Sequence, residues 1–584
     1  MKYERMTKGH FIERPNRFIA YVEIAGKKET VHVKNTGRCK ELLLPGVPVY
    51  VQKAENPARK TQWDLIAVEK GNRIINMDSQ VTNKVVQEWI EAGNLFEDVT
   101  RIKPEFTYKH SRFDIYVECG ERKILIEVKG VTLEEENVVK FPDAPSERAV
   151  KHVRELAEAV KDGYESYVFF VIQMEGASYF RPHTEMQPAF TEALQEARAK
   201  GVQMLAYECQ VAPERIEIAS EVPVILHNPE LYQIIEPLLR WYRHHQRRLP
   251  WREQKNAYHT WVSEIMLQQT RVEAVKPFYT RFLEALPTIK ALSEAKEDEL
   301  LKLWEGLGYY NRVRNMQKAA VQIMTDYHGE FPSSYEDIRK LPGIGNYTAG
   351  AISSIAFDIP KPAVDGNVLR VVSRLLGSDA DIMKAGVRSD IEAAVEEVIP
   401  KDAAGDFNQG LIELGAMVCV PNGAPKCGEC PAGIFCRARK EGREQELPVK
   451  KKAKARKVEA RTVFLFQDQE KLAIRKRPGK GLLAGLYEFP NVSGHLSMEE
   501  AAAYSKEIGM IPIRIRELPE AKHIFSHIEW NMKGYAVRVD ELEKSSNGDM
   551  LFIHPEEIEK QYPLPAAFAT YSAYAEIKLG QNRE

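Results

Sequence analysis

Hydrophobic and polar positions alternate in the first 80 residues of the chain. The clearest segments are 18–24 (FIAYVEI), 29–35 (ETVHVKN) and 47–53 (VPVYVQK), and glycine and proline separate them. A repeat of two residues is typical of strands that bury one face. We therefore predict a β-domain over residues 1–80.

Residues 81–226 alternate predicted strands with predicted helices. A helical pattern at 83–93 is followed by strand patterns at 113–118 and 123–130, a helical pattern at 147–163 and a strand pattern at 167–173. This alternation indicates an α/β domain that ends near Pro223–Pro229.

From residue 227 to residue 446 the hydrophobic repeat is mainly helical. It is clearest in segments 231–245, 258–286, 298–307 and 315–327, and Gly343 and Gly345 interrupt it. Residues 460–584 return to a mixed pattern, with strands expected at 461–467, 471–477 and 531–539. The chain is therefore expected to be multidomain.

Composition and charge favour a chain of several globular domains and argue against a membrane protein. A hydrophobic content of 44% over 584 residues is enough for several domain cores, and the net charge of −2 gives no overall basic field. Residues 1–13 contain no apolar leader, and the longest apolar run, 168–172, is too short to cross a bilayer. We expect a soluble, cytoplasmic monomer without membrane contact.

Residues 447–459 are expected to form a basic linker, either solvated or facing DNA; its cations are Lys450, Lys451, Lys452, Lys454, Arg456 and Lys457.

Four of the seven cysteines lie within eighteen residues, as Cys419, Cys427, Cys430 and Cys436. Four thiolates on one loop can surround a zinc ion or an iron–sulfur cluster, and the spacing alone favours zinc. No flavin, haem or nucleotide fingerprint precedes them, which indicates a structural or DNA-positioning role. The other three cysteines are scattered, as in proteins of a reducing compartment.

Two carboxylates have the chemistry that cleavage of an N-glycosidic bond requires. Glu264 interrupts an apolar run, and Asp365 precedes a helical segment. Taken singly, Glu264 is typical of a solvated helix face and Asp365 of a helix N-cap. As a pair they could protonate the leaving group and stabilise an oxocarbenium-like centre. The segment LPGIGNYTAG (341–350) could present backbone N–H groups to a phosphate, or simply connect two helices.

Residues 231–584 resemble an adenine DNA glycosylase of the MutY type over its full length. The matching stretches are LPWR (249–252), SEIMLQQT (263–270), WEGLGYYNRVRN (304–315), LPGIGNYTAGAI (341–352), PAVDGNVLRV (362–371) and FNQGLIELGAMVC (407–419). The resemblance implies an all-α helix-hairpin-helix domain over 227–446. It also implies a [4Fe–4S] cluster on the four cysteines, which reverses the preference for zinc. Seven residues separate Cys419 from Cys427, where the family usually has six.

The resemblance assigns roles to individual residues. Glu264 would protonate adenine and later assist water, Asp365 would stabilise the sugar cation, and Asn367 would support that carboxylate. Tyr347 stands where bifunctional relatives have a lysine, and a phenol forms no Schiff base, so the enzyme would be monofunctional. The residues that would contact DNA or the extruded base are Arg252, Gln269, Tyr309, Gly343, Gly345 and Gln409. Without the motif, Tyr309 could equally be a core residue.

Residues 460–584 resemble the α+β Nudix-like domain that closes this family, through segment 472–490. The glutamate-rich helix of a Nudix hydrolase is missing, so we expect a recognition module. Phe525, Ser526 and His527 match a loop associated with 8-oxoguanine, although an isolated triplet could be an ordinary turn. The expected partner is double-stranded DNA with A:8-oxoG or A:G mispairs.

The N-terminal part contains a second candidate site. Asp114 lies on one predicted strand, and Glu127 and Lys129 lie on one face of the next strand. Two carboxylates and a lysine can hold Mg²⁺ or Mn²⁺ and orient water. As a bare motif, this PD-(D/E)xK pattern often occurs by chance.

Longer stretches of the N-terminal part resemble the sugar fermentation stimulation protein (SfsA) family over residues 10–226. They are 31–46, 111–114, 127–133 and 141–156, with departures at Glu147, Ala149, Val150 and Gln187. The resemblance implies a DNA-binding module with an OB-like domain over 1–80 and a nuclease-like α/β domain over 81–226.

The favoured hypothesis is base-excision repair of adenine opposite 8-oxoguanine or guanine. The sequence leaves open a pyrimidine-lesion or mismatch glycosylase of the same superfamily, and a DNA-binding regulatory protein. It also leaves open whether the N-terminal module is a nuclease or only binds DNA.

Overall fold

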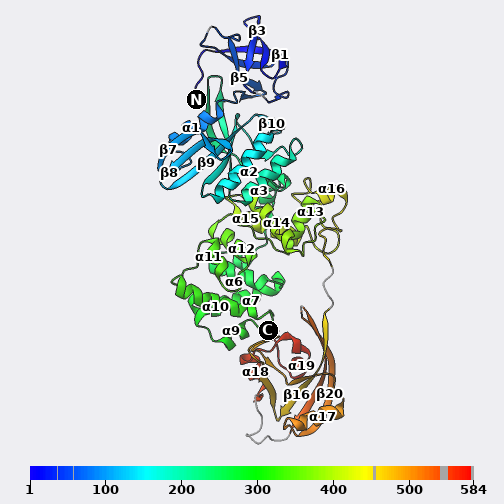
Figure 1. The fold of residues 1–584 in the computed structure, drawn as a ribbon. Helices are drawn as coiled ribbons and strands as arrows, with labels where there is room; N and C mark the ends of the chain where they lie inside the picture. The colour runs from blue at the N-terminus through cyan, green and yellow to red at the C-terminus, as the bar shows by residue number, and fades with distance from the viewer. Residues whose placement is uncertain (36, 57, 452–455, 526, 540–549, 580–584) are drawn as a thin grey trace. The chain divides into compact units, whose positions relative to one another are not determined.

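The chain folds into two compact units, Met1–Tyr232 and Gln233–Glu584, in a computed structural model (Figure 1). The structure describes residues 1–35, 37–56, 58–451, 456–525, 527–539 and 550–579. No helix among these residues is both long enough and apolar enough to cross a membrane. Each unit is described by itself.

The first part of the N-terminal unit is a six-stranded sheet in the order β3-β2-β1-β4-β5-β6, which an additional β3–β5 pairing closes. The strands are β1 (Met6–Asn16), β2 (Ile19–Ile24), β3 (Lys27–Val33), β4 (Pro48–Lys53), β5 (Trp63–Lys70) and β6 (Arg73–Asn76). Alternate apolar residues point into the barrel, where Val22, Val31 and Val49 are fully buried. The predicted β-domain with OB-like architecture is confirmed.

The rest of this unit is a mixed sheet in the order β15-β14-β12-β9-β8-β7. Its strands are β7 (Val99–Tyr108), β8 (Ser111–Cys119), β9 (Arg122–Val131), β12 (Glu165–Ile172), β14 (Gln203–Ala212) and β15 (Arg215–Glu221), and its helices are α1 (Thr82–Glu91), α2 (Glu147–Lys161) and α3 (Pro188–Ala199). A small sheet, β10-β11-β13, adds β10 (Leu133–Glu135), β11 (Val138–Phe141) and β13 (Tyr179–Pro182).

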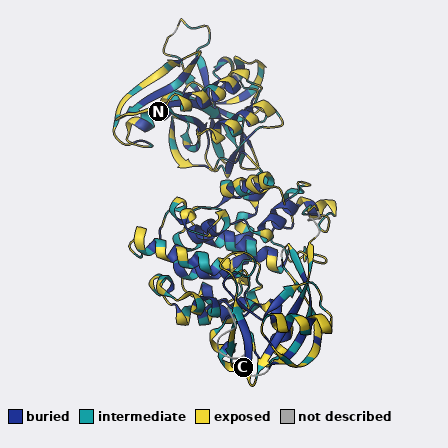
Figure 2. Cartoon of the chain, turned by 60° about the horizontal axis from the view of Figure 1, so that its bottom comes forward, coloured by how far each residue is buried: buried dark blue, intermediate teal, exposed yellow. Residues whose placement is uncertain are grey.

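Helices cover both faces of the mixed sheet. Val168 and Phe170 of β12 pack in the core shared with α2 and α3, while Phe169 packs in the core shared with α1. Figure 2 shows the resulting pattern, with buried strands and exposed outer sides of the helices. Glu127 and Lys129 alternate with the residues that face α1, so they lie on the α2 side of the sheet.

The second unit begins with helices. They are α5 (Ile235–His245), α6 (Ala257–Leu267), α7 (Val272–Ala285), α8 (Ile289–Glu294), α9 (Glu297–Leu303), α10 (Asn311–Asp326), α11 (Tyr335–Lys340), α12 (Asn346–Phe357), α13 (Gly366–Leu376), α14 (Ala385–Val398), α15 (Ala404–Met417) and α16 (Arg437–Glu441). A short helix, α4 (Pro229–Gln233), precedes them. The helical pattern of 258–286 is thus divided between α6 and α7, because Gln269 between them has a φ of +58° that no α-helix contains.

Close backbone packing fixes the segment before α13. A Cβ on Gly350 of α12 would lie 1.9 Å from the carbonyl oxygen of Pro362, so only glycine permits this approach. The contact places the start of α13, with Asp365, beside α12.

The C-terminal domain contains a mixed sheet with helices on both faces. Its elements are β16 (Lys457–Asp468), β17 (Lys471–Lys476), β18 (Tyr487–Glu488), β19 (Asn491–Ser493), α17 (Met498–Glu507), β20 (Pro512–Ile524), β21 (Ile528–Val539), β22 (Met550–Ile553), α18 (Pro555–Gln561) and α19 (Ala569–Tyr574). Phe464 and Phe466 of β16 face the core under α17, whereas Val463 and Leu465 face the core under α18 and α19.

This domain contacts the turn that precedes α10. Leu486 is fully buried in the same hydrophobic core as Trp304 and Leu307. The buried carboxylate of Glu305 accepts a hydrogen bond of 2.9 Å from the backbone N–H of Leu564. The C-terminal domain therefore packs against the helical domain at the motif 304–315.

Candidate functional site

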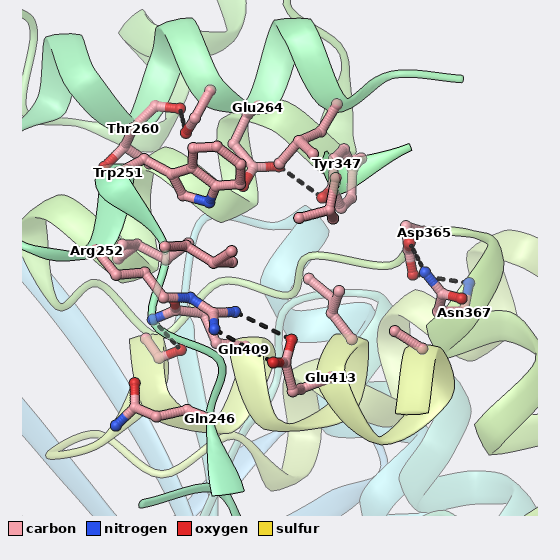
Figure 3. Close-up of a pocket in the computed structure, with 18 of the residues that line it drawn as sticks. Gln246, Trp251, Arg252, Thr260, Glu264, Tyr347, Asp365, Asn367, Gln409 and Glu413 are labelled. Atoms are coloured by element: carbon pink, nitrogen blue, oxygen red, sulfur yellow. Dashed lines mark hydrogen bonds and ion pairs between the residues drawn. The ribbon is translucent and has the colours of Figure 1, made fainter. Parts of the chain in front are cut away.

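A cavity of about 900 Å³ opens in the helical domain of the second unit. Its walls come from α6, α12, α15, the start of α13 and the loop that precedes α6 (Figure 3). The sequence-predicted residues Arg252, Glu264, Gln269, Tyr347, Asp365, Asn367 and Gln409 all line it. Tertiary folding thus brings together seven residues that are spread over 158 positions of the chain.

Glu264 extends from α6 into this cavity, and only 7% of it is exposed. One of its carboxylate oxygens accepts a 2.6 Å hydrogen bond from the phenol of Tyr347 on α12 (Figure 3). Burial raises the pKa of Glu264 to about 7, against the opposing effect of that hydrogen bond, and the nearby charge of Asp365 adds to the increase. Glu264 is therefore a buried carboxyl group and does not lie on a solvated helix face.

Asp365 is the N-cap of α13 and also lines the cavity. One oxygen accepts from the backbone N–H groups of Asn367 and Val368, both at 2.8 Å. The other oxygen accepts from the side-chain amide of Asn367 at 2.7 Å. Burial raises the pKa of Asp365, while these three hydrogen bonds stabilise its charged form. The cap and the candidate catalytic carboxylate are thus the same group.

Asn367 links Asp365 to the cysteine loop. Its side-chain oxygen accepts from Arg370 at 2.9 Å, and the same guanidinium donates to the carbonyl of Cys419 at 2.7 Å. A Cβ on Gly415 of α15 would approach the Asn367 side chain to 2.6 Å. The amide therefore has little freedom to rotate.

Arg252 and Gln409 lie side by side in the cavity wall, and Arg252 donates to the Gln409 side-chain oxygen at 3.0 Å. Arg252 and Arg247 also donate to Glu413, which is fully buried on α15. Burial alone would raise the pKa of Glu413, but the two guanidinium groups hold it at about 2. Sequence reasoning missed Glu413, although it follows Gln409 by four residues and so shares its helix face.

Gln269 and Tyr309 occupy two tight turns with φ values of +58° and +50°. Tyr309 is 49% exposed, whereas the neighbouring Tyr310 is 7% exposed and belongs to the core. Of the two tyrosines, only Tyr310 fits the core-packing alternative.

The turn before α12 has the geometry of a hairpin. Gly343 has a φ of +80°, and a Cβ there would approach the Asn315 side chain to 2.7 Å. Gly345 is the N-cap of α12, and nothing lies within 4 Å of where its Cβ would be. Gly345 has no side chain with which to cap the first N–H groups of α12, so these groups can meet an anion.

Cys419, Cys427, Cys430 and Cys436 line one small cavity between α13, α15 and α16. Four thiolates around a single zinc ion would lie about 3.8 Å apart, since Zn–S bonds are about 2.3 Å long. Within the described residues, no three Cys, His, Asp or Glu side chains gather around one point in that way.

The thiols of this loop are partly or fully removed from water. Burial raises the pKa of Cys427 and Cys436, and raises that of Cys430 to about 12. Arg374 donates to the Cys419 sulfur at 3.2 Å. The seven-residue gap folds back so that the Lys426 N–H donates to the Val418 carbonyl, which returns Cys427 to the cavity.

The triplet 525–527 joins β20 to β21. The ring of Phe525 packs edge-to-face on Trp530 at 5.0 Å, and His527 is exposed. Ser526 lies outside the described residues. The His527 carbonyl accepts from the Lys457 N–H at 3.1 Å, so His527 lies beside the start of β16.

In the N-terminal unit, Asp114 on β8 accepts from the Val128 N–H of β9 at 2.8 Å. Glu127 is 2% exposed, and its Oε1 contacts the Lys129 ammonium and lies 2.7 Å from Nδ1 of His152. Its Oε2 is buried without a hydrogen-bond partner among the described residues. His152 on α2 was not predicted, because only the fold brings it to Glu127.

The two units belong to two different classes of protein domain: an SfsA-type module and a base-excision DNA glycosylase. Four family profiles match, with these descriptions: SfsA N-terminal OB domain (12–77), sugar fermentation stimulation protein RE domain (80–215), HhH-GPD superfamily base excision DNA repair protein (262–399) and NUDIX domain (462–573). A sugar fermentation stimulation protein homolog of Clostridium beijerinckii is 59% identical over 226 residues, 39% of this chain and 100% of that protein. The chain belongs to the sugar fermentation stimulation protein family, and its second unit adds HhH-GPD glycosylase and Nudix-like domains, consistent with an SfsA–MutY-type fusion.

Two solved structures are also similar to parts of the chain. SfsA of Pyrococcus furiosus in complex with Ca²⁺ is 29% identical, with coverage of 38% of this chain and 97% of that one and a TM-score of 0.36. A thermostable thymine-DNA glycosylase is 26% identical, with coverage of 37% and 98% and a TM-score of 0.34. Scores of this size identify neither a substrate nor a mechanism for this chain.

Replacement of Glu264 by glutamine should make the protein less sensitive to pH. The folded pKa of about 7 exceeds the ordinary 4.5, so this carboxyl group contributes stability below pH 4.5 that is lost as pH rises to 7. Between pH 5 and pH 8, wild type should therefore lose about 2–3 kcal/mol relative to Glu264→Gln. Urea titrations followed by far-UV circular dichroism measure this difference. Equal pH dependence in the two proteins would show that the carboxyl group ionises normally.

Proposed function

We propose that the second unit is a monofunctional adenine DNA glycosylase that acts on A:8-oxoG and A:G mispairs. The observation that carries the proposal is the pair Glu264 and Asp365, which line one cavity in opposite environments. Glu264 has one hydrogen bond and a pKa of about 7, as suits a general acid. Asp365 has three N–H donors, as suits a group that stays anionic.

The proposed reaction uses both groups. Protonated Glu264 gives its proton to N7 of the extruded adenine, and the electron pair of the C1′–N9 bond leaves with the base. The Asp365 carboxylate stabilises the positive charge that develops on the sugar. Water then adds to C1′ and loses a proton to the Glu264 carboxylate, which restores the acid and leaves an abasic site.

Other residues of the cavity fit this reaction. Burial and the adjacent carboxylates raise the pKa of Tyr347 well above its usual value, so its phenol remains a hydrogen-bond donor to Glu264. No amine takes its place, so the strand would remain intact. Arg252 and Gln409 would contact the edge of the adenine, with Arg252 held by Glu413.

The four cysteines would hold a [4Fe–4S] cluster, whose iron would supply the positive charge that four thiolates around one cavity require. Arg374 would stabilise the Cys419 sulfur by its hydrogen bond. The contact from Arg370 to the Cys419 carbonyl then gives the loop a structural connection to Asn367 and Asp365.

The C-terminal domain would read the base opposite the adenine. Its helix α17 has the sequence MEEAAAYSKE, which lacks the REUxEE pattern of a Nudix hydrolase. The triplet 525–527 would instead offer a hydroxyl and an imidazole to the N7–H and O8 groups of 8-oxoguanine. The triplet and Tyr347 argue against a pyrimidine-lesion glycosylase. The pair Glu264 and Asp365 argues against an inactive DNA-binding protein.

For the N-terminal unit, we propose a divalent-metal site at Asp114 and Glu127. The unpartnered Oε2 of Glu127 supports it, because a buried carboxylate oxygen without a donor is stabilised by a cation. Mg²⁺ or Mn²⁺ would activate water for attack on a DNA phosphodiester, with Lys129 beside the developing charge.

Glu264→Gln should abolish adenine release while the mispair is still bound. Loss of a general acid slows such reactions by about 100- to 10,000-fold. In wild type, the single-turnover rate on an A:8-oxoG duplex should fall as pH rises through about 7, because the acid must be protonated. The product strand should break only after alkali, and borohydride should trap no adduct.

The exposed Glu284 of α7 provides a matched control, since Glu284→Gln makes the same chemical change away from the cavity. Turnover of Glu264→Gln at the rate of this control would refute the assignment. Faster release of an oxidised pyrimidine than of adenine by wild type would favour the alternative glycosylase.

The double variant Ser526→Ala, His527→Ala should lower the preference for A:8-oxoG over A:G by about tenfold, through the loss of two hydrogen bonds. The ratio of the two single-turnover rates measures it. Ser493→Ala with His495→Ala makes the same change elsewhere in the domain and should leave the ratio unchanged. An unaltered ratio in the first variant would place lesion reading elsewhere.

Asp114→Asn should weaken Mn²⁺ binding at the N-terminal site at least tenfold, because one of two anionic ligands becomes neutral. Calorimetry of the full chain measures the affinity, and plasmid nicking with Mg²⁺ or Mn²⁺ reports nuclease activity. The exposed Asp98 gives the control Asp98→Asn. Unchanged metal binding in Asp114→Asn would contradict the metal site and would favour a unit that only binds DNA.

A further inference from the structure

Arg312 lies in the first turn of α10 and makes five side-chain hydrogen bonds, all to backbone carbonyls. One terminal nitrogen donates to Ile265, Met266 and Gln268 at 2.7, 3.1 and 2.7 Å. The other donates to Leu307 and Gly308, both at 3.0 Å. One guanidinium therefore joins two segments that are about 40 residues apart in the sequence.

Both segments lead directly into strained turns. The Gln268 carbonyl precedes Gln269, and the Gly308 carbonyl precedes Tyr309; both Gln269 and Tyr309 have left-handed backbones. For residues with a side chain this conformation costs roughly 1–2 kcal/mol each, so neighbouring contacts must maintain it. Arg312 holds the peptide group immediately before each of them.

The first segment is also the end of the helix that carries Glu264. The Ile265 and Met266 carbonyls belong to the last turn of α6, where a cation is favourable. Arg312 remains charged, since burial lowers its pKa only to about 10. The Trp304 and Tyr309 rings lie 5.3 and 5.6 Å from its guanidinium carbon and limit its movement.

We infer that Arg312 is a positioning residue for base extrusion: it fixes the Gln269 and Tyr309 turns to each other and to the end of α6. The inference rests on the proposed function, in which Glu264 meets the extruded adenine, and on the resemblance, which implies that Gln269 and Tyr309 contact the DNA. A lysine has three donors on one atom and lacks the planar fork, so it cannot reach both segments equally well.

Arg312→Met should slow single-turnover release from A:8-oxoG by about 100-fold, the usual effect of a small displacement of reacting groups. With 2-aminopurine in place of adenine, the rise in fluorescence on binding should be at least fivefold smaller than in wild type. Affinity for the duplex should change by less than about threefold. Arg312→Lys should give intermediate values.

A substrate with its adenine already unpaired, opposite an abasic site, separates positioning from a general structural role. Extrusion is then largely complete, so the defect of Arg312→Met should shrink to about tenfold or less. An equal defect on both substrates, or normal 2-aminopurine fluorescence, would overturn the inference. Lys318→Met removes an exposed cation from the same helix and should match wild type.

Thermal melting checks the folding of each variant. If Arg312→Met does not fold, Arg312→Lys serves as the test of the inference in its place. Full activity and fluorescence in Arg312→Lys would then overturn the inference. The fluorescence signal needs duplex binding but no catalysis. A wild type that extrudes 2-aminopurine without releasing adenine would therefore contradict the proposed function and leave the role of Arg312 supported.

Discussion

Unequal stabilisation of two buried carboxyl groups is the physical constraint on which the candidate site depends. Glu264 loses its water and receives one hydrogen bond from protein, so its neutral form becomes accessible near neutral pH. Asp365 loses water too, but the start of α13 replaces it with two backbone N–H groups and an amide. Acid and anion can therefore coexist in one cavity.

The surrounding architecture maintains this difference. Gly350 permits α12 to approach the segment before Asp365, which sets the backbone that caps the carboxylate. Arg370 ties Asn367 to the cysteine loop, and Arg312 ties the end of the Glu264 helix to the turn of Tyr309. Glu305, which lies just before the turn of Tyr309 in the sequence, accepts a hydrogen bond from the C-terminal domain. The cysteine loop, the cavity and the C-terminal domain are thus joined by arginine–carbonyl contacts and by hydrogen bonds to buried carboxylates.

Much of this organisation was predictable from local patterns. Alternation with a period of two residues predicted β2, β3 and β4, and the helical repeat predicted α2 and α10, because these elements bury one regular face. Sequence motifs also pointed to Glu264, Asp365 and Asp114. The break between α6 and α7 was not predicted, because the residue types around Gln269 are compatible with a helix. In the structure Gln269 has a left-handed backbone, and Arg312 donates to the Gln268 carbonyl just before it.

The sequence by itself determined the types of element, the four-cysteine loop and the absence of an amine at Tyr347, because these depend on residue identity and short spacing. Only the tertiary structure decided which polar groups lose water and which partners replace it. Glu413 between two arginines, His152 beside Glu127 and Arg312 between two turns illustrate this. Desolvation depends on what covers a side chain, and the covering segments lie far away in the sequence.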